Sequence, residues 1–221
     1  MKTLVAAATV VATLATTGYS QSVNWRALDD QRTDVVQVNI GYDYAATAQV
    51  GYARLFDAFR PVLVGVDLSL PMGKDLVDDF KIRLGGQIEI VEAGGFSATI
   101  RLASLFRRYE SDFVRIVSFG SDFGLLAGYY DAGWFAAGEF GFDKSIISNL
   151  KHAGVLKEYF PGIRDGWYIP TGGHYYYGIQ AGKTLGELLD LSLRLGATTA
   201  QASDENAVLP YYLQLGVGVR F

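Results

Sequence analysis

Residues 80–90 read FKIRLGGQIEI, and two kinds of side chain alternate through this stretch. One parity is apolar, and the other carries Lys81, Arg83, Gly85, Gln87 and Glu89. Successive side chains of a β-strand point to opposite faces, whereas the faces of a helix repeat about every 3.6 residues. The stretch therefore predicts a strand with one apolar face and one polar face.

The same alternation recurs along most of the chain. It covers the segments 35–42, 48–53, 62–70, 80–90, 96–103, 117–127, 134–143, 175–182, 189–195 and 211–221. So many half-apolar strands in one chain predict an all-β, antiparallel, up-and-down sheet closed into a barrel of ten strands. A further hairpin could lie within 144–172, which gives the strand count a margin of two.

The composition excludes several classes of protein. Half of the 221 residues are hydrophobic, 19% are charged, the net charge is −4, Cys is absent, and His152 and His174 are the two histidines. The chain is too apolar for a disordered protein, and it lacks the basic patch of a nucleic-acid binder. Without Cys there is no disulfide framework and no Cys/His metal site, and no sequence motif calls for a cofactor.

The first twenty residues have the layout of a secretory signal peptide. Lys2 supplies a positive charge, an apolar run covers residues 4–14, and Gly18 and Ser20 are the small residues before a cut ahead of Gln21. A run of this length is too short to span a bilayer, and no later stretch reaches the roughly 18 apolar residues of a membrane helix. We therefore expect a signal peptide at 1–20 and one barrel domain at 21–221.

The connections between the expected strands alternate in length. Short breaks lie near 57–60, 92–94, 130–132 and 183–187, and longer ones lie at 71–79, 107–112, 144–172 and 198–208, although the short break at 43–45 departs from the pattern. Short turns on one rim and long loops on the other are typical of outer-membrane barrels. The sequence predicts a helix over 145–159 within the longest loop, which we expect outside the cell, with both termini in the periplasm.

Alternation alone does not decide which face points outward. A soluble periplasmic ligand-binding barrel has its apolar face inside, whereas an outer-membrane barrel has that face in lipid. The polar parity here is poor in charge and rich in Gly, Ser and Ala, which suits a narrow lumen better than a water-exposed surface. Aromatic side chains also lie near strand ends, as in interfacial girdles: Tyr42, Phe80, Phe96, Trp134, Tyr175 and Tyr211.

The last eleven residues, YYLQLGVGVRF, end on an aromatic residue preceded by apolar residues at every second position. This pattern resembles the C-terminal signal strand of outer-membrane β-barrel proteins of Gram-negative bacteria. The matching residues are Tyr211, Leu213, Leu215, Val217, Val219 and Phe221. The resemblance implies insertion into the outer membrane by the barrel-assembly machinery, with membrane lipid and lipopolysaccharide as neighbours.

The polar parity predicts a charged lumen. Its members include Lys81, Arg83, Glu89, Arg101, Asp122, Glu139, Asp190 and Arg194, and also Asp67, Asp143 and Arg220. Nearly balanced charges in a narrow barrel must pair, because burial of an isolated charge is costly. The sequence therefore favours a self-neutralising network that largely plugs the lumen over a charge-selective pore, which would need a ring of like charges.

A catalytic alternative rests on His174, at the mouth of a strand. A histidine at the rim could serve as the general base of a lipid or peptide hydrolase, but no motif with a matching carboxylate or serine accompanies it. His152 falls within the expected loop helix, as a solvated side chain. The preferred expectation is a non-enzymatic barrel with a structural or interaction role, or at most a narrow passive conduit.

Two segments could contact partners. Arg107 and Arg108 in the expected 107–112 loop could bind the phosphates of lipopolysaccharide, although a solvated turn is the simpler reading. Aromatic side chains of the long loop could form a patch for an extracellular or periplasmic protein partner, or could fold into the lumen: Tyr159, Phe160, Trp167 and Tyr168.

Overall fold

The computed structural model describes residues 22–73, 78–169, 172–201 and 209–221. The signal peptide expected at 1–20 lies outside these ranges. The strands are β1 (Asp34–Tyr42), β2 (Ala46–Asp57), β3 (Pro61–Pro71), β4 (Asp79–Ala93), β5 (Phe96–Glu110), β6 (Val114–Tyr130), β7 (Trp134–His152), β8 (Gly166–Tyr168), β9 (Gly173–Leu185), β10 (Leu189–Ala200) and β11 (Tyr211–Arg220). Two short helices, η1 (Trp25–Ala27) and α2 (Gly154–Tyr159), complete the described elements.

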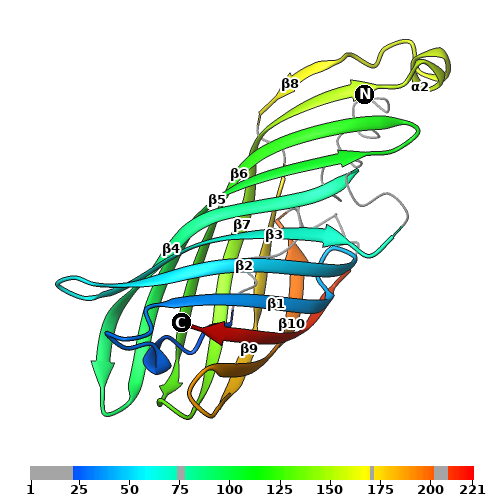
Figure 1. The fold of residues 1–221 in the computed structure, drawn as a ribbon. Coiled ribbons are helices and arrows are strands. Elements are labelled where there is room, and N and C mark those ends of the chain that lie inside the picture. Colours follow the sequence, from blue (N-terminus) through cyan, green and yellow to red (C-terminus); the bar gives the residue numbers. More distant parts are fainter. Residues whose placement is uncertain (1–21, 74–77, 170–171, 202–208) are drawn as a thin grey trace.

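Ten strands form one closed antiparallel ring (Figure 1). Each strand pairs with its neighbours in the chain, β7 pairs with β9, and β1 closes the ring against β11 from Val35↔Arg220 to Tyr42↔Leu213. The short β8 pairs only with the end of β7 and stays outside the ring. This arrangement confirms the predicted closed, up-and-down barrel of ten strands.

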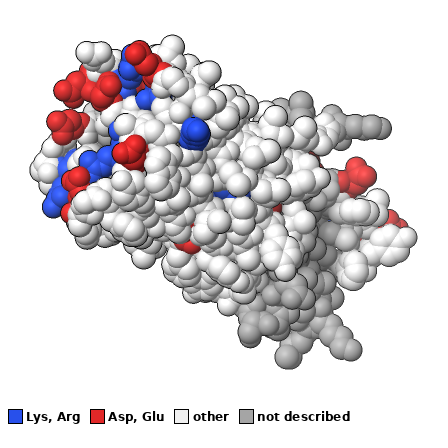
Figure 2. All heavy atoms as spheres, turned by 90° about the horizontal axis from the view of Figure 1, so that it is seen from below, with Lys and Arg blue, Asp and Glu red and all other residues white. Residues whose placement is uncertain are grey.

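The barrel has its apolar face outward. Leu84, Leu102 and Leu215 are 60%, 61% and 63% exposed, whereas Arg83 and Arg101 of the opposite parity are 0% and 1% exposed. Figure 2 shows the outcome on the surface: most of the charged side chains in view gather at one end, a few lie at the other end, and the broad surface between them is nearly uncharged. The aromatic side chains at strand ends also lie on this outer face, with Tyr129 and Trp134 stacked 5.1 Å apart.

The two rims differ. One rim, here called the turn end, carries the connections 58–60, 94–95, 131–133 and 186–188, together with residues 22–33 and Phe221. The other rim, the loop end, carries the connections 43–45 and 111–113, together with the described parts of three longer connections, residues 72–73 and 78, 153–169 and 172, and 201 and 209–210. Among the residues that the structure describes, no helix is both long enough and apolar enough to cross a bilayer.

Two expectations about the loop end are wrong. Residues 145–152 are not helical but continue β7, and the helix is confined to α2. The 107–112 segment is not a long loop, because β5 runs to Glu110 and only 111–113 connects it to β6. In both places the strands extend beyond the apolar belt, and their ends there contain polar residues.

Candidate functional site

The interior of the barrel is the candidate site, and its polar side chains lie in a central tier, in a loop-end tier and around residues 22–28 at the turn end. The central tier takes one side chain from each of six neighbouring strands of the ring: Arg101 (β5), Asp122 (β6), Glu139 (β7), Tyr176 (β9), Arg194 (β10) and Tyr212 (β11). All six side chains are buried. Strand alternation explains the tier, because each residue belongs to the inward-facing parity of its strand.

The charges of the central tier pair with each other. Arg194 Nε donates to Glu139 Oε1 at 2.6 Å, and the Tyr212 hydroxyl donates to the same oxygen at 2.8 Å. Arg101 Nη2 donates to the Tyr176 hydroxyl at 2.7 Å, which in turn donates to Asp122 Oδ1 at 2.7 Å. The contacts form one connected network, because Arg101 also lies 3.9 Å from Glu139 Oε2. Two cations therefore balance two carboxylates in the middle of the lumen.

Inward-facing glycines make room for the two tyrosine rings. A Cβ atom at Gly141 would lie 2.1 Å from the Tyr176 hydroxyl, and one at Gly178 or Gly196 would lie 2.3 or 2.2 Å from the Tyr212 hydroxyl. Each ring therefore packs directly on the backbone of neighbouring strands. The two rings therefore occupy part of the lumen at the level of the central tier.

The loop-end tier has its own ion pairs. Arg83 Nε donates to Asp67 Oδ1 at 2.9 Å, and Lys81 lies 3.5 Å from Asp43 Oδ2. The 43–45 connection places the buried Tyr44 here, where the Arg107 guanidinium carbon lies 4.3 Å from its ring centre. Lys81 Nζ also lies 5.2 Å from the centre of the Tyr44 ring, and cations are attracted to the face of such an electron-rich ring. These contacts hold Tyr44 within the loop-end tier.

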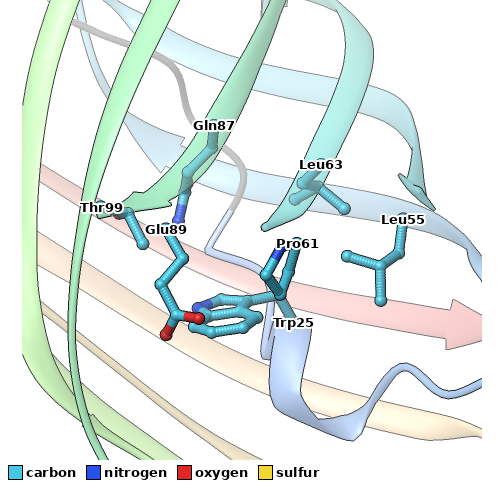
Figure 3. Close-up of a pocket in the computed structure, with 7 residues that line it drawn as sticks. All are labelled: Trp25, Leu55, Pro61, Leu63, Gln87, Glu89 and Thr99. Atoms are coloured by element: carbon cyan, nitrogen blue, oxygen red, sulfur yellow. The ribbon is translucent and has the colours of Figure 1, made fainter. Parts of the chain in front are cut away.

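Residues 22–28, here called the N-terminal plug, close the turn end. Ser22, Val23, Asn24, Trp25, Ala27 and Leu28 are all buried. Trp25 packs 5.6 Å from the ring of Tyr130, and Arg26 Nη2 lies 3.0 Å from Glu89 Oε1. Figure 3 shows the Trp25 ring beside Glu89, in a pocket whose cavity of about 10 Å³ is near the minimum for a single water.

The plug is also tied to the last strand. Arg220 Nη1 donates to the carbonyl oxygen of Ala27, and Arg220 Nε lies 2.9 Å from Asp190 Oδ2. Gln37 Nε2 donates to the carbonyl oxygen of Ser22 at 3.3 Å. Sequence reasoning missed the plug, because its residues show no strand alternation. The one signal in the sequence was the Trp25-Arg26 pair just after the expected cleavage site.

The structure thus brings together the residues expected in the lumen. The central and loop-end tiers contain Lys81, Arg83, Arg101, Asp122, Glu139 and Arg194. Glu89 pairs with Arg26 of the N-terminal plug, and Asp190 pairs with Arg220 of the last strand. The residues of the C-terminal pattern face outward: Tyr211, Leu213, Leu215, Val217, Val219 and Phe221 are 42% to 71% exposed.

The structure places both histidines on strands. His174, expected at the mouth of a strand, is the second residue of β9, where it is 1% exposed and faces the interior of the barrel opposite Asp143 of β7. His152 is not a solvated helix residue but the buried last residue of β7. Its backbone N–H donates to Asp165 Oδ1 at 2.9 Å, and Lys157 donates to Asp165 Oδ2 at 2.6 Å. These two contacts hold the pKa of Asp165 below its ordinary value of 3.8.

The expected partner-binding residues separate. Arg107 is buried and bonds Asp79 through two nitrogens at 3.0 and 2.9 Å, whereas Arg108 faces outward and pairs with Glu110. Tyr159, Phe160, Trp167 and Tyr168 are exposed, so they do not enter the lumen. Within the described ranges, no group of three or more His, Cys, Asp or Glu side chains could hold a metal ion.

Comparison with known proteins gives likeness of structure only. No family model matches the chain, and no curated protein matches it. The KdgM porin in complex with disordered oligogalacturonate is 8% identical, with a TM-score of 0.42, covering 85% of this chain and 99% of that one. The beta domain of the Bordetella autotransporter BrkA is 13% identical, with a TM-score of 0.39, covering 87% and 99%. The strand pairing itself defines the architecture.

Proposed function

We propose that this chain is an outer-membrane β-barrel with a closed lumen, which serves as an anchor and interaction protein and not as an open porin or an enzyme. In this proposal residues 1–20 are a cleaved signal peptide, the turn end faces the periplasm, and the loop end faces outward. The apolar outer face supports insertion into lipid, because exposing so much apolar surface to water would be unfavourable. The apolar outer face also argues against a soluble periplasmic barrel, whose outer face would be polar.

The central tier carries the proposal. An open conduit needs a continuous hydrated path, and here Arg101, Glu139 and Arg194 meet across the lumen with Tyr176 and Tyr212 packed between them. Tyr44 and the N-terminal plug add closures at the two ends. Mixed charges at close range also argue against selection of ions of one sign.

A rim hydrolase finds less support. A general base must reach its substrate, and His174 is buried inside the barrel.

The terminal aromatic strand supports assembly by the barrel-assembly machinery, which would recognise the outward row that ends at Phe221. The exposed aromatic residues around Trp167 support an outward partner of the loop end.

Planar-bilayer recording tests the closed lumen. The chain from Gln21 to Phe221 is refolded into lipid, and insertion is verified by the shift of the unheated protein on a gel. We expect no steady openings from the wild type, and openings from a Tyr176→Ala/Tyr212→Ala variant that removes both rings. Steady conductance of the inserted wild type would refute the closed barrel. Recovery of the protein without detergent, in the soluble periplasmic fraction, would refute the membrane location.

A further inference from the structure

An aromatic row crosses the outer face near the loop end. The ring centres of Phe80 and Phe106 lie 5.8 Å apart, those of Phe106 and Phe119 lie 5.2 Å apart, and those of Phe119 and Trp167 lie 6.4 Å apart. Rings of this kind gather at the boundary between hydrocarbon and headgroups. The row therefore marks the depth at which the apolar belt ends on β4, β5, β6 and β8.

Two cations lie beyond this row on the same outward parity. Arg115 of β6 and Lys151 of β7 are directly opposite in the register, and both are exposed. Arg115 precedes Phe119 by four residues, or about 13 Å along a strand. That distance places the pair at the level of lipid headgroups and not of acyl chains.

The pair lacks a carboxylate partner. Glu110 lies opposite Arg115 in the register, but its carboxylate pairs with Arg108. The Asp165 carboxylate of the adjacent loop is engaged by His152 and Lys157. No ion pair joins Arg115 or Lys151 to another residue in the described part of the chain. Like charges directly opposite each other destabilise a sheet, unless an anion lies between them.

A groove lies beside the two cations. Its volume is about 180 Å³, and its walls are Glu110, Ser111, Val114, Arg115, Lys151, His152 and Ala153. The wall formed by the start of the long loop is fixed, because His152 bonds Asp165 through both its backbone N–H and Nδ1. The groove therefore offers two cations and a preformed wall to a tetrahedral anion.

We propose that Arg115 and Lys151 bind a phosphate group of a phosphorylated glycolipid in the outer leaflet, with Phe119 and Trp167 against its acyl chains. This inference rests on the proposed function, since it needs the loop end in the outer leaflet. Arginine supplies several donors to phosphate oxygens, and lysine adds a point charge. The site faces lipid instead of the lumen, so its phosphate comes from a lipid and not from a free solute.

Binding is measured by native mass spectrometry of the barrel in detergent micelles. The probes are diphosphorylated lipid A, its dephosphorylated counterpart and inorganic phosphate. We expect the wild type to retain diphosphorylated lipid A. An Arg115→Gln/Lys151→Gln variant should bind it at least about tenfold more weakly, a loss of affinity that corresponds to the loss of a charge-assisted contact. The control is Arg60→Gln/Lys183→Gln, which removes two exposed cations at the turn end and should bind like the wild type.

Each other outcome would overturn the inference. Equal retention by the Arg115→Gln/Lys151→Gln variant would remove the pair as the site. Equal retention of dephosphorylated lipid A would mean that acyl chains alone carry the binding. Competition by millimolar inorganic phosphate in place of lipid would point to a free solute. Bilayer insertion and conductance are recorded on the same samples, so failure of the proposed function is seen separately from failure of this site.

Discussion

The hydroxyl of Tyr176 occupies the space that a side chain at residue 141 would need. A Cβ atom there would lie 2.1 Å from that oxygen and 2.6 Å from the carbonyl oxygen of Phe123. The ring crosses from β9 onto the bare backbone of β7, and from there its hydroxyl reaches Asp122 of β6 at 2.7 Å. One glycine thus lets a single side chain connect three strands across the lumen.

Gly141→Ala is therefore expected to destabilise the barrel by about 1–3 kcal/mol, the usual range for an overpacked core. The added Cβ must displace the Tyr176 ring, and it also comes 2.6 Å from the backbone oxygen of Phe123, which strand pairing holds in place. Urea unfolding in phospholipid vesicles, followed by tryptophan fluorescence, measures the change. Gly138→Ala is the control, because its nearest neighbours are 3.9 Å away and it should stay near the wild-type value.

The pairing of Glu139 with Arg194 predicts strong coupling between the two residues. Either Glu139→Leu or Arg194→Leu leaves a buried charge without its partner, which costs about 3–5 kcal/mol. Because the double variant removes both charges, it should cost clearly less than the sum of the two single variants. A double-mutant cycle measured by urea unfolding tests this expectation. Additive costs would mean that the Glu139–Arg194 pair is not coupled in the folded barrel.

The N-terminal plug predicts protection of the turn end from solutes. Thr99 is 2% exposed and lines the same small cavity as Trp25, and the chain has no native cysteine. A Thr99→Cys variant should react slowly with a polar maleimide. Adding Trp25→Ala should speed the reaction, because loss of the ring opens the cavity and removes its packing on Tyr130.

Conductance serves as the control for the Trp25→Ala variant. It should stay silent in a bilayer, because in the proposed closed barrel the central tier blocks conduction independently of the plug. Equal labelling rates with and without Trp25 would show that residues 22–28 do not seal this rim.

The anchoring of the long loop predicts a specific response to acid. A carboxylate whose pKa is lowered on folding adds stability above its unfolded pKa, and this stability is lost as the pH falls through the folded pKa. For Asp165 the ordinary value is 3.8 and the folded value is lower, so the contact with His152 should persist at pH 4 and weaken only in stronger acid. The rate of hydrogen exchange at the His152 backbone amide, measured as a function of pH, reports whether this contact persists. Asp165→Asn should lower the protection at neutral pH and flatten its pH dependence.

The terminal residue predicts a difference between refolding and assembly in cells. The backbone of Phe221 bonds Asp34 through both its N–H and its carbonyl, at 3.0 and 3.1 Å, and its side chain is exposed. Phe221→Ala keeps those backbone bonds, so refolding into detergent should be unchanged. Insertion in cells should fall if the side chain is an assembly signal. Loss of refolding in detergent would instead assign Phe221 a role in stability.

Strand alternation predicted the barrel and its lumen because both depend on parity. Arg83, Arg101 and Arg194 share the parity opposite to the apolar residues of their strands, and they lie inside. The error over residues 145–152 has a local cause. Phe119 and Gly120 of β6 pair with Ile147 and Ser145 of β7, so Ile146 is an extra, bulged residue in β7. Beyond this bulge the inward-facing positions of β7 change from odd to even residue numbers, which breaks the alternation in the sequence.

Other features depend on contacts that no local pattern contains. The 107–110 run is charged at every position but Tyr109, which resembles a loop, yet β5 continues there beyond the apolar belt. The burial of residues 22–28 arises from side chains of distant strands, such as Tyr130 and Arg220. Arg115 and Lys151 attract attention only once the register places them opposite each other.

The seam between β1 and β11 has a consequence for the order of events in folding. Val35 pairs with Arg220, so the first strand finds its second neighbour only when the last residues of the chain arrive. Until then β1 has an open edge that could pair with another molecule, and closing so long a loop is slow. A chain that ends before residue 211 would keep that edge exposed, and such an edge is a template for pairing with another chain and for aggregation.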